Sequence, residues 1–236
     1  MNLRIKTHIY ADGADLTKIK NFNKCSWIKG FTTNPSLIKK SGYSNYMQYA
    51  RKVLNVVKKK PVSLEIFSDN HDQMINDALK LSKLAKNVYV KIPIINTKGI
   101  STIPVIQELN NQDISLNITA IFTYEQVKKI ITSIKKPKDI ILSIFAGRIA
   151  DTGRDPKKII KKINLIKKKN FRILWASTRE IYSIVESNSS KCDIVTVPHD
   201  LLEKFSVIGK PLERYSLETV RTFYNDAKIK GYSLNE

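Results

Sequence analysis

The sequence has few of the residues that stabilise disulfide-linked or metal-bound proteins. It contains two cysteines, Cys25 and Cys192, which are too few for a disulfide framework. We expect both to be small buried or half-buried residues in a reducing cytoplasm. The three histidines, His8, His71 and His199, are far apart in the sequence, and we expect them to be structural or exposed. The sequence therefore predicts neither a disulfide scaffold nor a metal site.

Long apolar runs and interdomain linkers are also missing. No stretch approaches the ~18 apolar residues that span a membrane, and the segment Met1–Lys6 lacks the apolar core of a signal peptide. These absences predict a cytoplasmic protein that does not associate with a membrane. No linker rich in glycine, proline or serine divides the chain, so we expect one catalytic domain over residues 1–236.

Negative charge is scarce relative to positive charge, and the formal net charge is +20. Such a charge can indicate nucleic-acid binding, but the lysines are scattered in pairs and triplets over many segments. Most of them fall on the polar faces of expected helices, and no zinc finger, helix-turn-helix or RNA-recognition motif accompanies them. We therefore expect no nucleic-acid partner. A positive field of this kind can attract anionic substrates.

Strand-like runs alternate with helix-like segments along the whole chain. The eight expected strands are residues 6–12, 26–32, 62–67, 88–93, 114–119, 139–145, 172–176 and 193–197. This alternation predicts an α/β protein with a (β/α)8 (TIM) barrel. A doubly wound sheet is the alternative, but the turn after the first strand, Asp12-Gly13-Ala14-Asp15, is not a phosphate-binding glycine fingerprint.

Apolar residues at helical spacing predict the helices between the strands. Amphipathic stretches cover residues 72–85, 124–134 and 156–168, and a further helical segment lies around residues 201–205. An additional C-terminal helix is expected over Ser216–Lys230, ending at Gly231. Its apolar face could contact another subunit, or it could pack on its own barrel.

Lys91 is the most informative residue in the sequence. It lies within the short apolar run Val88–Pro93, whose length and β-branched residues predict a buried strand. A buried lysine is costly unless it is neutral or paired, and a neutral amine is a nucleophile toward carbonyl groups. The position therefore predicts Schiff-base chemistry. The alternative is an edge strand whose lysine faces solvent.

Polar residues gather at the carboxyl ends of the other expected strands, which share one face in a barrel. These residues are Asp12, Thr32, Asn34, Glu65, Asn117, Thr119, Ser143, Arg148, Ser177 and Arg179, and the apolar Phe145 lies at the same end of its strand. Each also has a purely structural interpretation. Asp12 could cap the helix that follows, and Asn34 could be a turn residue with Ser36 as the helix N-cap. Glu65 could be an exposed strand residue, and Arg179 could pair with Glu180 or Glu186 on a helix surface. Their joint placement at strand ends favours a site.

The motifs at these strand ends resemble those of the transaldolase family of class I aldolases. The matching segments, in order along the chain, are residues 30–38 (GFTTNPSLI), 90–93 (VKIP), 117–119 (NIT), 143–151 (SIFAGRIAD) and 176–179 (ASTR). The resemblance spans nearly the whole chain. It implies a (β/α)8 barrel, no metal, no cofactor and a homo-oligomer.

The resemblance also implies a role for each residue in the transfer of a dihydroxyacetone unit. Lys91 would form a Schiff base with the ketose, Asp12 would move the proton of the C4 hydroxyl, and Glu65 with Thr119 would hold a proton-shuttling water. The remaining residues would bind substrate: Thr32, Asn34, Asn117, Ser143 and Phe145 around the three-carbon unit, and Arg148, Ser177 and Arg179 at the phosphate.

The implied substrates are phosphorylated sugars of the pentose phosphate pathway. The donor would be sedoheptulose 7-phosphate or fructose 6-phosphate, and the acceptor glyceraldehyde 3-phosphate or erythrose 4-phosphate. The family also contains fructose-6-phosphate aldolases, which release free dihydroxyacetone and carry glutamine at the Glu65 position and tyrosine at the Phe145 position. Both residues here follow the transaldolase pattern. An aldolase, or a related enzyme of a specialised sugar pathway, remains the alternative, and the role of the nearby Arg154 is open.

Overall fold

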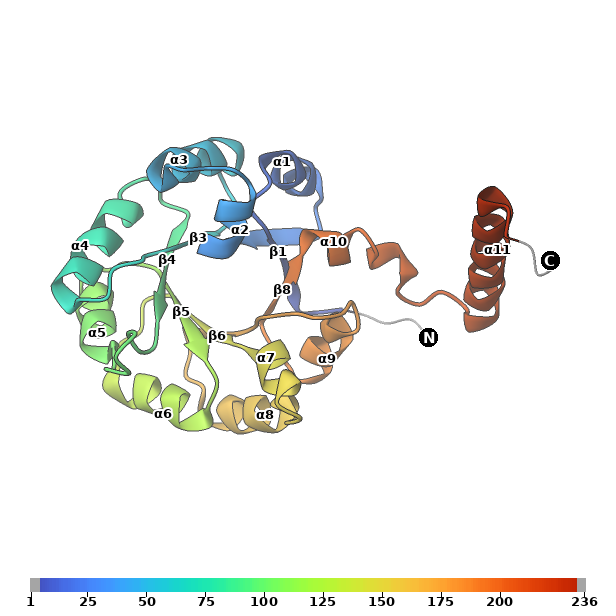
Figure 1. The fold of residues 1–236 in the computed structure, drawn as a ribbon. Helices are drawn as coiled ribbons and strands as arrows, with labels where there is room; N and C mark the ends of the chain where they lie inside the picture. The colour runs from blue at the N-terminus through green and yellow to red at the C-terminus, as the bar shows by residue number, and fades with distance from the viewer. Residues whose placement is uncertain (1–4, 233–236) are drawn as a thin grey trace.

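Eight parallel strands close into a barrel in sequential order from β1 to β8, with helices around the outside (Figure 1). The structure is a computed structural model that describes residues 5–232. The strands are β1 (His8–Asp12), β2 (Ile28–Thr32), β3 (Val62–Glu65), β4 (Val88–Pro93), β5 (Leu116–Ile121), β6 (Ile140–Ile144), β7 (Phe171–Trp175) and β8 (Ile194–Pro198). The predicted barrel is therefore confirmed. The single domain predicted over residues 1–236 stays a prediction, and its residues 1–4 and 233–236 lie outside the described residues.

Several helices begin at residues whose side chains cap them. Asp15 accepts from the backbone of Thr17 and Lys18 at the start of the first helix, and Thr123 forms a capping box with Gln126. The helices are α1 (Leu16–Lys24), α2 (Pro35–Lys40), α3 (Tyr46–Val56), α4 (His71–Ser82), α5 (Ile103–Asn111), α6 (Tyr124–Ser133), α7 (Ala146–Asp151), α8 (Pro156–Ile166), α9 (Ser183–Ser189), α10 (His199–Leu202), the 3-10 helix η1 (Phe205–Val207) and α11 (Leu212–Lys230). The expected strands agree with the observed ones to within two residues at either end.

Side chains that alternate along each strand divide the core into two parts. The residues that face the helices, such as Ile9, Val90 and Leu142, belong to the large core between barrel and helices. The alternate residues fill the barrel interior with a small apolar cluster of Tyr10, Tyr89, Ile141, Leu174, Ala176 and Ile194. Two residues further along three of these strands, the same inward positions become Asp12, Lys91 and Ser143. Because every second residue of a strand faces inward, a polar layer lies directly above this interior apolar cluster.

Gly30 and Tyr10 show how tightly the interior apolar cluster is packed. A Cβ atom at Gly30 would lie 2.5 Å from the Tyr10 ring, so only glycine leaves room for the ring inside the barrel. Tyr10 is 1 % exposed. At the amino-terminal end, Arg172 donates to Asp139 and to the hydroxyl of Tyr89 at 2.8 Å each. Among the described residues, these side chains fill the barrel at its amino-terminal end, which leaves the carboxyl ends of the strands as the open side.

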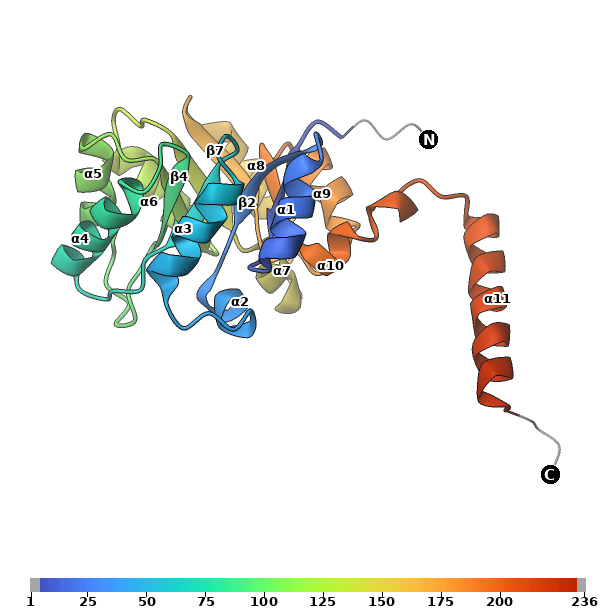
Figure 2. The ribbon, with the colours of Figure 1, turned by 90° about the horizontal axis from the view of Figure 1, so that it is seen from above.

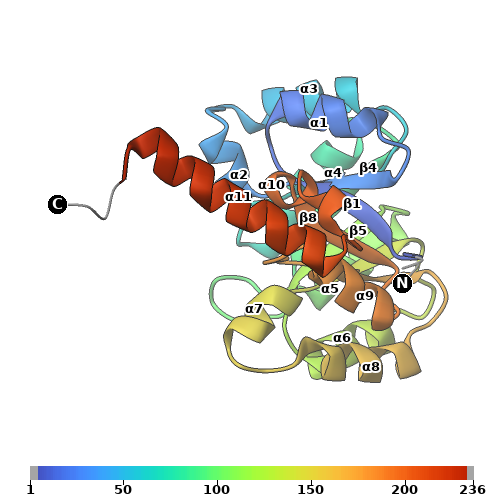
Figure 3. The ribbon, with the colours of Figure 1, turned by 90° about the vertical axis from the view of Figure 1, so that its right-hand side faces the viewer.

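Helix α11 stands apart from the ring of barrel helices (Figures 1 and 2). It contains no buried residue, and Figure 3 looks onto the side of the molecule from which it extends. Gly231, at φ 66°, caps its end as predicted. The alternative in which this helix packs on its own barrel is therefore wrong. Among residues 5–232, no helix combines the length and hydropathy needed to cross a membrane.

Candidate active site

A cavity of about 450 Å³ opens at the carboxyl ends of the strands. Eleven of the twelve residues predicted from the sequence line it. They are Asp12, Thr32, Asn34, Glu65, Lys91, Thr119, Ser143, Phe145, Arg148, Ser177 and Arg179. Asn117 is the exception. The barrel therefore gathers side chains that come from seven different strands or the loops after them.

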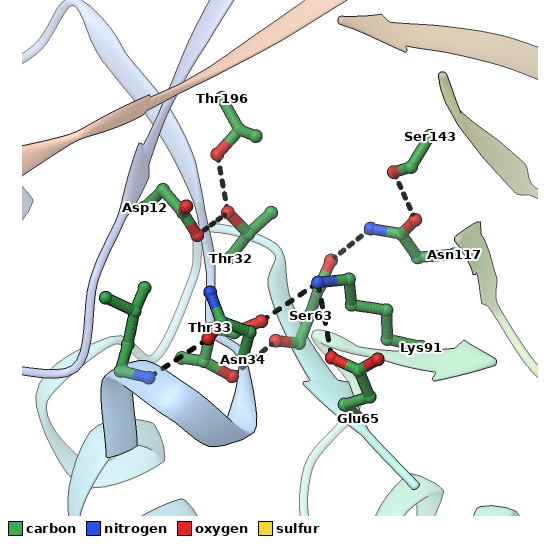
Figure 4. A network of polar contacts seen from close by, with 11 residues as sticks. Asp12, Thr32, Thr33, Asn34, Ser63, Glu65, Lys91, Asn117, Ser143 and Thr196 are labelled. Carbon is green, nitrogen blue, oxygen red and sulfur yellow. Dashed lines mark hydrogen bonds and ion pairs between the residues drawn. The ribbon is translucent and has the colours of Figure 1, made fainter. Parts of the chain in front are cut away.

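Lys91 lies in the wall of this cavity and is 8 % exposed. Its strand pairs with β3 on one side and β5 on the other, so the alternative of a solvent-facing lysine on an edge strand is wrong. The amine Nζ donates to the carbonyl oxygen of Thr33 at 3.1 Å and lies 3.4 Å from Oε2 of Glu65 (Figure 4). The uncharged form of such an amine is a nucleophile toward carbonyl groups.

Asp12 ends β1 on the same inward side. The hydroxyl of Thr32 donates to its Oδ1 at 2.7 Å. Burial raises the pKa of Asp12, while the charge of Lys91 and the hydrogen bond from Thr32 act in the opposite direction. A carboxyl group with a raised pKa can both take and return a proton, as a general acid and base must.

Thr119 is a buried hydroxyl that has no partner. Its Oγ1 makes no hydrogen bond to any of the described residues, although it lines the cavity. Thr119 and Glu65 lie on β5 and β3, the two neighbours of the strand that carries Lys91. An unpaired buried hydroxyl is costly unless a water or a ligand satisfies it. This position is suited to hold a water or a substrate oxygen beside the lysine.

Asn117 lies below the cavity, within a hydrogen-bonded row. Its Nδ2 donates to Oγ of Ser63 at 2.9 Å, and Oγ of Ser143 donates to its Oδ1 at 2.6 Å (Figure 4). Asn117 is fully buried, so the structure gives no direct contact between this amide and the cavity. It supports Ser143, which does line the cavity. Asn34 lines the cavity, and its Oδ1 accepts from the backbone of Leu37 and so caps α2. Ser36, the N-cap expected from the sequence, lies inside α2 instead.

A basic rim closes one side of the cavity where α7 meets the loop after β7. A Cβ atom at Gly147 would lie 1.7 Å from the carbonyl oxygen of Ser177, so this glycine permits the contact that places Arg148 beside that loop. Ser177 itself has a φ of 62°, the left-handed region that non-glycine residues rarely adopt. The guanidinium of Arg148 lies 5.4 Å from the ring centre of Phe145. Phe145 was expected at the end of the sixth strand, but it lies just after β6 and immediately before α7.

Arg179 pairs across this rim with Asp151 at 2.5 Å. The alternative partners, Glu180 and Glu186, are not used, and Glu186 pairs with Lys157 instead. Two guanidiniums and a hydroxyl around one opening can bind a phosphate dianion. Arg154 does not line the cavity and donates to Oγ1 of Thr152 at 2.9 Å.

Sequence reasoning missed three residues that hold this arrangement together. Thr33 accepts from Lys91, Ser63 orients Asn117, and the hydroxyl of Thr196 contacts that of Thr32. Thr196 could have been found, because it lies at an inward position two residues after Ile194 of the interior cluster. Within residues 5–232, no group of three or more histidine, cysteine or carboxylate residues is arranged to hold a metal ion.

Comparison with known proteins gives one consistent result. A family model described as Transaldolase/Fructose-6-phosphate aldolase matches residues 9–235. A "Probable transaldolase" of Methanococcus maripaludis strain C6 is 34% identical over 198 residues, covering 83% of this chain and 87% of the relative. A "Probable transaldolase" of Sulfurihydrogenibium sp. strain YO3AOP1 is 32% identical over 212 residues, covering 89% and 92%.

Solved structures resemble the chain at the level of the fold. The 3-hexulose-6-phosphate synthase of Salmonella typhimurium superposes with a TM-score of 0.59 and 12% sequence identity, covering 85% of this chain and 96% of that one. This likeness supports the barrel architecture.

Proposed function

The chain belongs to the transaldolase/fructose-6-phosphate aldolase family, and from this premise we propose that it is a transaldolase. It would transfer a dihydroxyacetone unit from a ketose phosphate to an aldose phosphate. The observation that carries this proposal is the buried amine of Lys91, which faces a cavity between the carboxyl groups of Asp12 and Glu65 and has an arginine-rich rim at its mouth.

The first half of the proposed reaction forms and uses an imine. Lys91 attacks the C2 carbonyl of the ketose, and loss of water leaves a protonated imine that draws electrons from the C3–C4 bond. Asp12 takes the proton of the C4 hydroxyl, the C3–C4 bond breaks, and an aldose phosphate leaves. The unpartnered hydroxyl of Thr119, together with Glu65, would hold the water that moves protons during imine formation.

The second half reverses these steps with a new aldehyde. The three-carbon unit stays on Lys91 as an enamine, whose nucleophilic carbon attacks the acceptor while Asp12 returns its proton to the new hydroxyl. Water then hydrolyses the imine and frees the product. Thr32, Asn34, Ser143 and Phe145 surround the space for the three-carbon unit, and Asn117 would act on it through Ser143. Arg148, Ser177 and Arg179 would bind the phosphate.

Two residues favour transfer over simple release of dihydroxyacetone. Glu65 places a carboxylate 3.4 Å from the amine, and Phe145 presents no hydroxyl to the cavity. A tyrosine at this position would add an acid and a water anchor that could assist hydrolysis of the enamine. Both residues follow the transaldolase pattern, so a fructose-6-phosphate aldolase is the second candidate.

A coupled assay separates these two activities. The purified protein is given fructose 6-phosphate with erythrose 4-phosphate, and then without it. A transaldolase converts the sugar only when the acceptor is present. Steady release of free dihydroxyacetone without acceptor would instead assign the aldolase activity. If the protein converts neither of these phosphorylated sugars but does convert an unphosphorylated ketose, it belongs to a specialised sugar pathway.

We also propose that the protein works as a homo-oligomer in the cytoplasm, within the pentose phosphate pathway. Helix α11 supports the first part, because its apolar side chains Leu217, Val220, Phe223 and Tyr224 are between 49% and 68% exposed. A helix of this kind needs a surface to cover its apolar side chains, and a second copy of the chain would supply one. The remaining parts rest on the family resemblance.

A further inference from the structure

Three side chains from three neighbouring strands form a hydrogen-bonded row at the edge of the cavity. Oγ1 of Thr32 on β2 lies 2.7 Å from Oδ1 of Asp12 on β1 and 2.5 Å from Oγ1 of Thr196 on β8 (Figure 4). Strand β1 pairs with both β2 and β8, so the closure of the barrel brings the three together. Thr32 and Thr196 are 164 residues apart in the sequence.

The number of hydrogen atoms fixes the direction of these bonds. An ionised carboxylate can only accept hydrogen bonds, so Thr32 must donate its single hydroxyl hydrogen to Asp12. The short contact between the two threonines then needs the hydrogen of Thr196. Thr196 therefore donates to Thr32, and Thr32 donates to Asp12.

We propose that Thr196 is a positioning residue for the transfer reaction, acting through Thr32 on the carboxyl group of Asp12. This proposal rests on the proposed function. Within residues 5–232, the row holds Oδ1 of Asp12 and leaves Oδ2 without a hydrogen bond, free to exchange a proton with the substrate. Because a hydroxyl that accepts a bond becomes a stronger donor, Thr196 strengthens the bond from Thr32 that favours the ionised form of Asp12.

The other groups around Asp12 determine how much the hydrogen bond from Thr32 affects its ionisation. Lys91 is the cation that faces it, and Glu65, Arg148 and Arg179 line the same cavity. Behind it, Tyr49 interacts with its charge, and His199 packs against the adjacent Gly13. Burial opposes ionisation of Asp12, and the two favourable contributions come from Lys91 and Thr32. Weakening the hydrogen bond from Thr32 therefore reduces one of the two contributions that favour the ionised form of Asp12.

The backbone of Thr196 makes a structural hydrogen bond that does not involve its hydroxyl. Its backbone carbonyl accepts from Oγ1 of Thr178 at 2.6 Å, whereas its hydroxyl contacts Thr32. The side chain lines the cavity and is 5 % exposed. Replacement by valine keeps the shape and the backbone bond and removes only the donor.

The test compares Thr196→Val with Thr196→Ser and a matched control, Thr7→Val. Thr7 is another buried threonine, and its hydroxyl donates to the carbonyl of Cys192 near the other end of the barrel. The ionisation of Asp12 is followed directly in each variant by ¹³C NMR of labelled aspartate carboxyl groups. The Asp12 signal is identified as the one that disappears in Asp12→Asn. The acid side of the pH profile of kcat/KM is recorded in parallel.

We expect Thr196→Val to move the Asp12 titration upward by about half a pH unit, and the acid limb of kcat/KM with it. Thr196→Ser should restore both, and Thr7→Val should lower Tm without moving either. An unchanged Asp12 titration in a folded Thr196→Val variant would overturn the proposal. The NMR measurement does not need turnover, so a protein that shows the shift but has no transfer activity would refute the proposed function and leave the action of Thr196 on Asp12 standing.

Discussion

The guanidinium of Arg179 and the carboxylate of Asp151 form an ion pair of 2.5 Å across the mouth of the cavity. Asp151 ends helix α7, which also carries Arg148, so one short helix supplies both an arginine for the rim and the carboxylate that holds the other arginine. Both members of the pair are about half exposed, and such a pair is weak in water. A phosphate group can therefore draw Arg179 from Asp151 at little cost.

Removal of Arg179 should weaken binding of phosphorylated sugars. We expect Arg179→Ala to raise KM for fructose 6-phosphate by about 10- to 150-fold, because a hydrogen bond to a charged group is worth about 1.5–3 kcal/mol. The effect on kcat should be smaller. Arg154→Ala is the matched control, since that arginine lies nearby but outside the cavity. Equal KM values for Arg179→Ala and the wild type would mean that the substrate is unphosphorylated or bound elsewhere.

Replacement of Asp12 should separate activity from stability. Asp12→Asn should abolish transfer, because the amide cannot take the proton of the C4 hydroxyl. The raised pKa of Asp12 means that the folded protein keeps this proton to higher pH than the unfolded chain does. Folding is therefore penalised progressively as the pH rises above 3.8, and the penalty is complete above the folded-state pKa.

Asp12→Asn should consequently have a higher Tm than the wild type at pH 7, and the difference should shrink as the pH falls toward 4. Thermal unfolding at a series of pH values measures this directly. A variant that is less stable than the wild type at pH 7 would show that Asp12 contributes to folding more than its burial costs.

His199 should make the folded protein sensitive to acid. Its ring packs on Phe22, with 5.3 Å between ring centres. Its Nε2 is buried and makes no hydrogen bond to any residue between 5 and 232. Burial, helped by the charge of Lys18, lowers the pKa of His199 to about 4 from the usual 6.5. The unfolded chain binds a proton in this interval that the folded protein does not, so stability is lost as the pH falls from 6.5 toward 4.

The loss should reach roughly 3 kcal/mol across that interval, from the size of the pKa difference. His199→Phe keeps an aromatic ring against Phe22 and cannot be protonated. Its urea unfolding free energy should therefore change less between pH 6.5 and 4 than that of the wild type. Identical pH dependence in the two proteins would rule out His199 as the cause of acid sensitivity.

Polar substitutions on the apolar side of α11 should dissociate the proposed homo-oligomer. We expect Val220→Glu combined with Tyr224→Glu to reduce the molecular mass measured by light scattering, while the barrel keeps its circular dichroism. Thr222→Glu with Asn225→Glu is the control, because these two residues lie on the opposite side of the helix from Val220 and Tyr224. A mass that is the same for all three proteins would place the subunit contacts elsewhere or show that the chain is monomeric.

The sequence predicted the barrel and most of the cavity lining because both depend on local patterns. The run around Lys91 indicated a buried strand, and the alternation along each strand put the polar ends on one face. Contacts between strands distant in the sequence could not be predicted in this way. The bond from Thr196 to Thr32 exists only because β8 and β2 both flank β1. The burial of Asn117 depends in the same way on Ser63 and Ser143.

The placement of α11 was also beyond the sequence. Its amphipathic pattern predicted a helix with one apolar side, and the same pattern suits packing on its own barrel or on another chain. The extended segment after η1 decides between them, because it carries the helix away from the barrel (Figure 2).

The most direct test of the central claim is to trap the proposed imine on Lys91. The protein is incubated with fructose 6-phosphate, reduced with borohydride and digested, and the peptides are analysed by mass spectrometry. We expect the mass of one reduced dihydroxyacetone unit on Lys91, and none in Lys91→Met or without the sugar. A label on another lysine, or no label in a folded protein that converts the sugar, would contradict the Schiff-base mechanism.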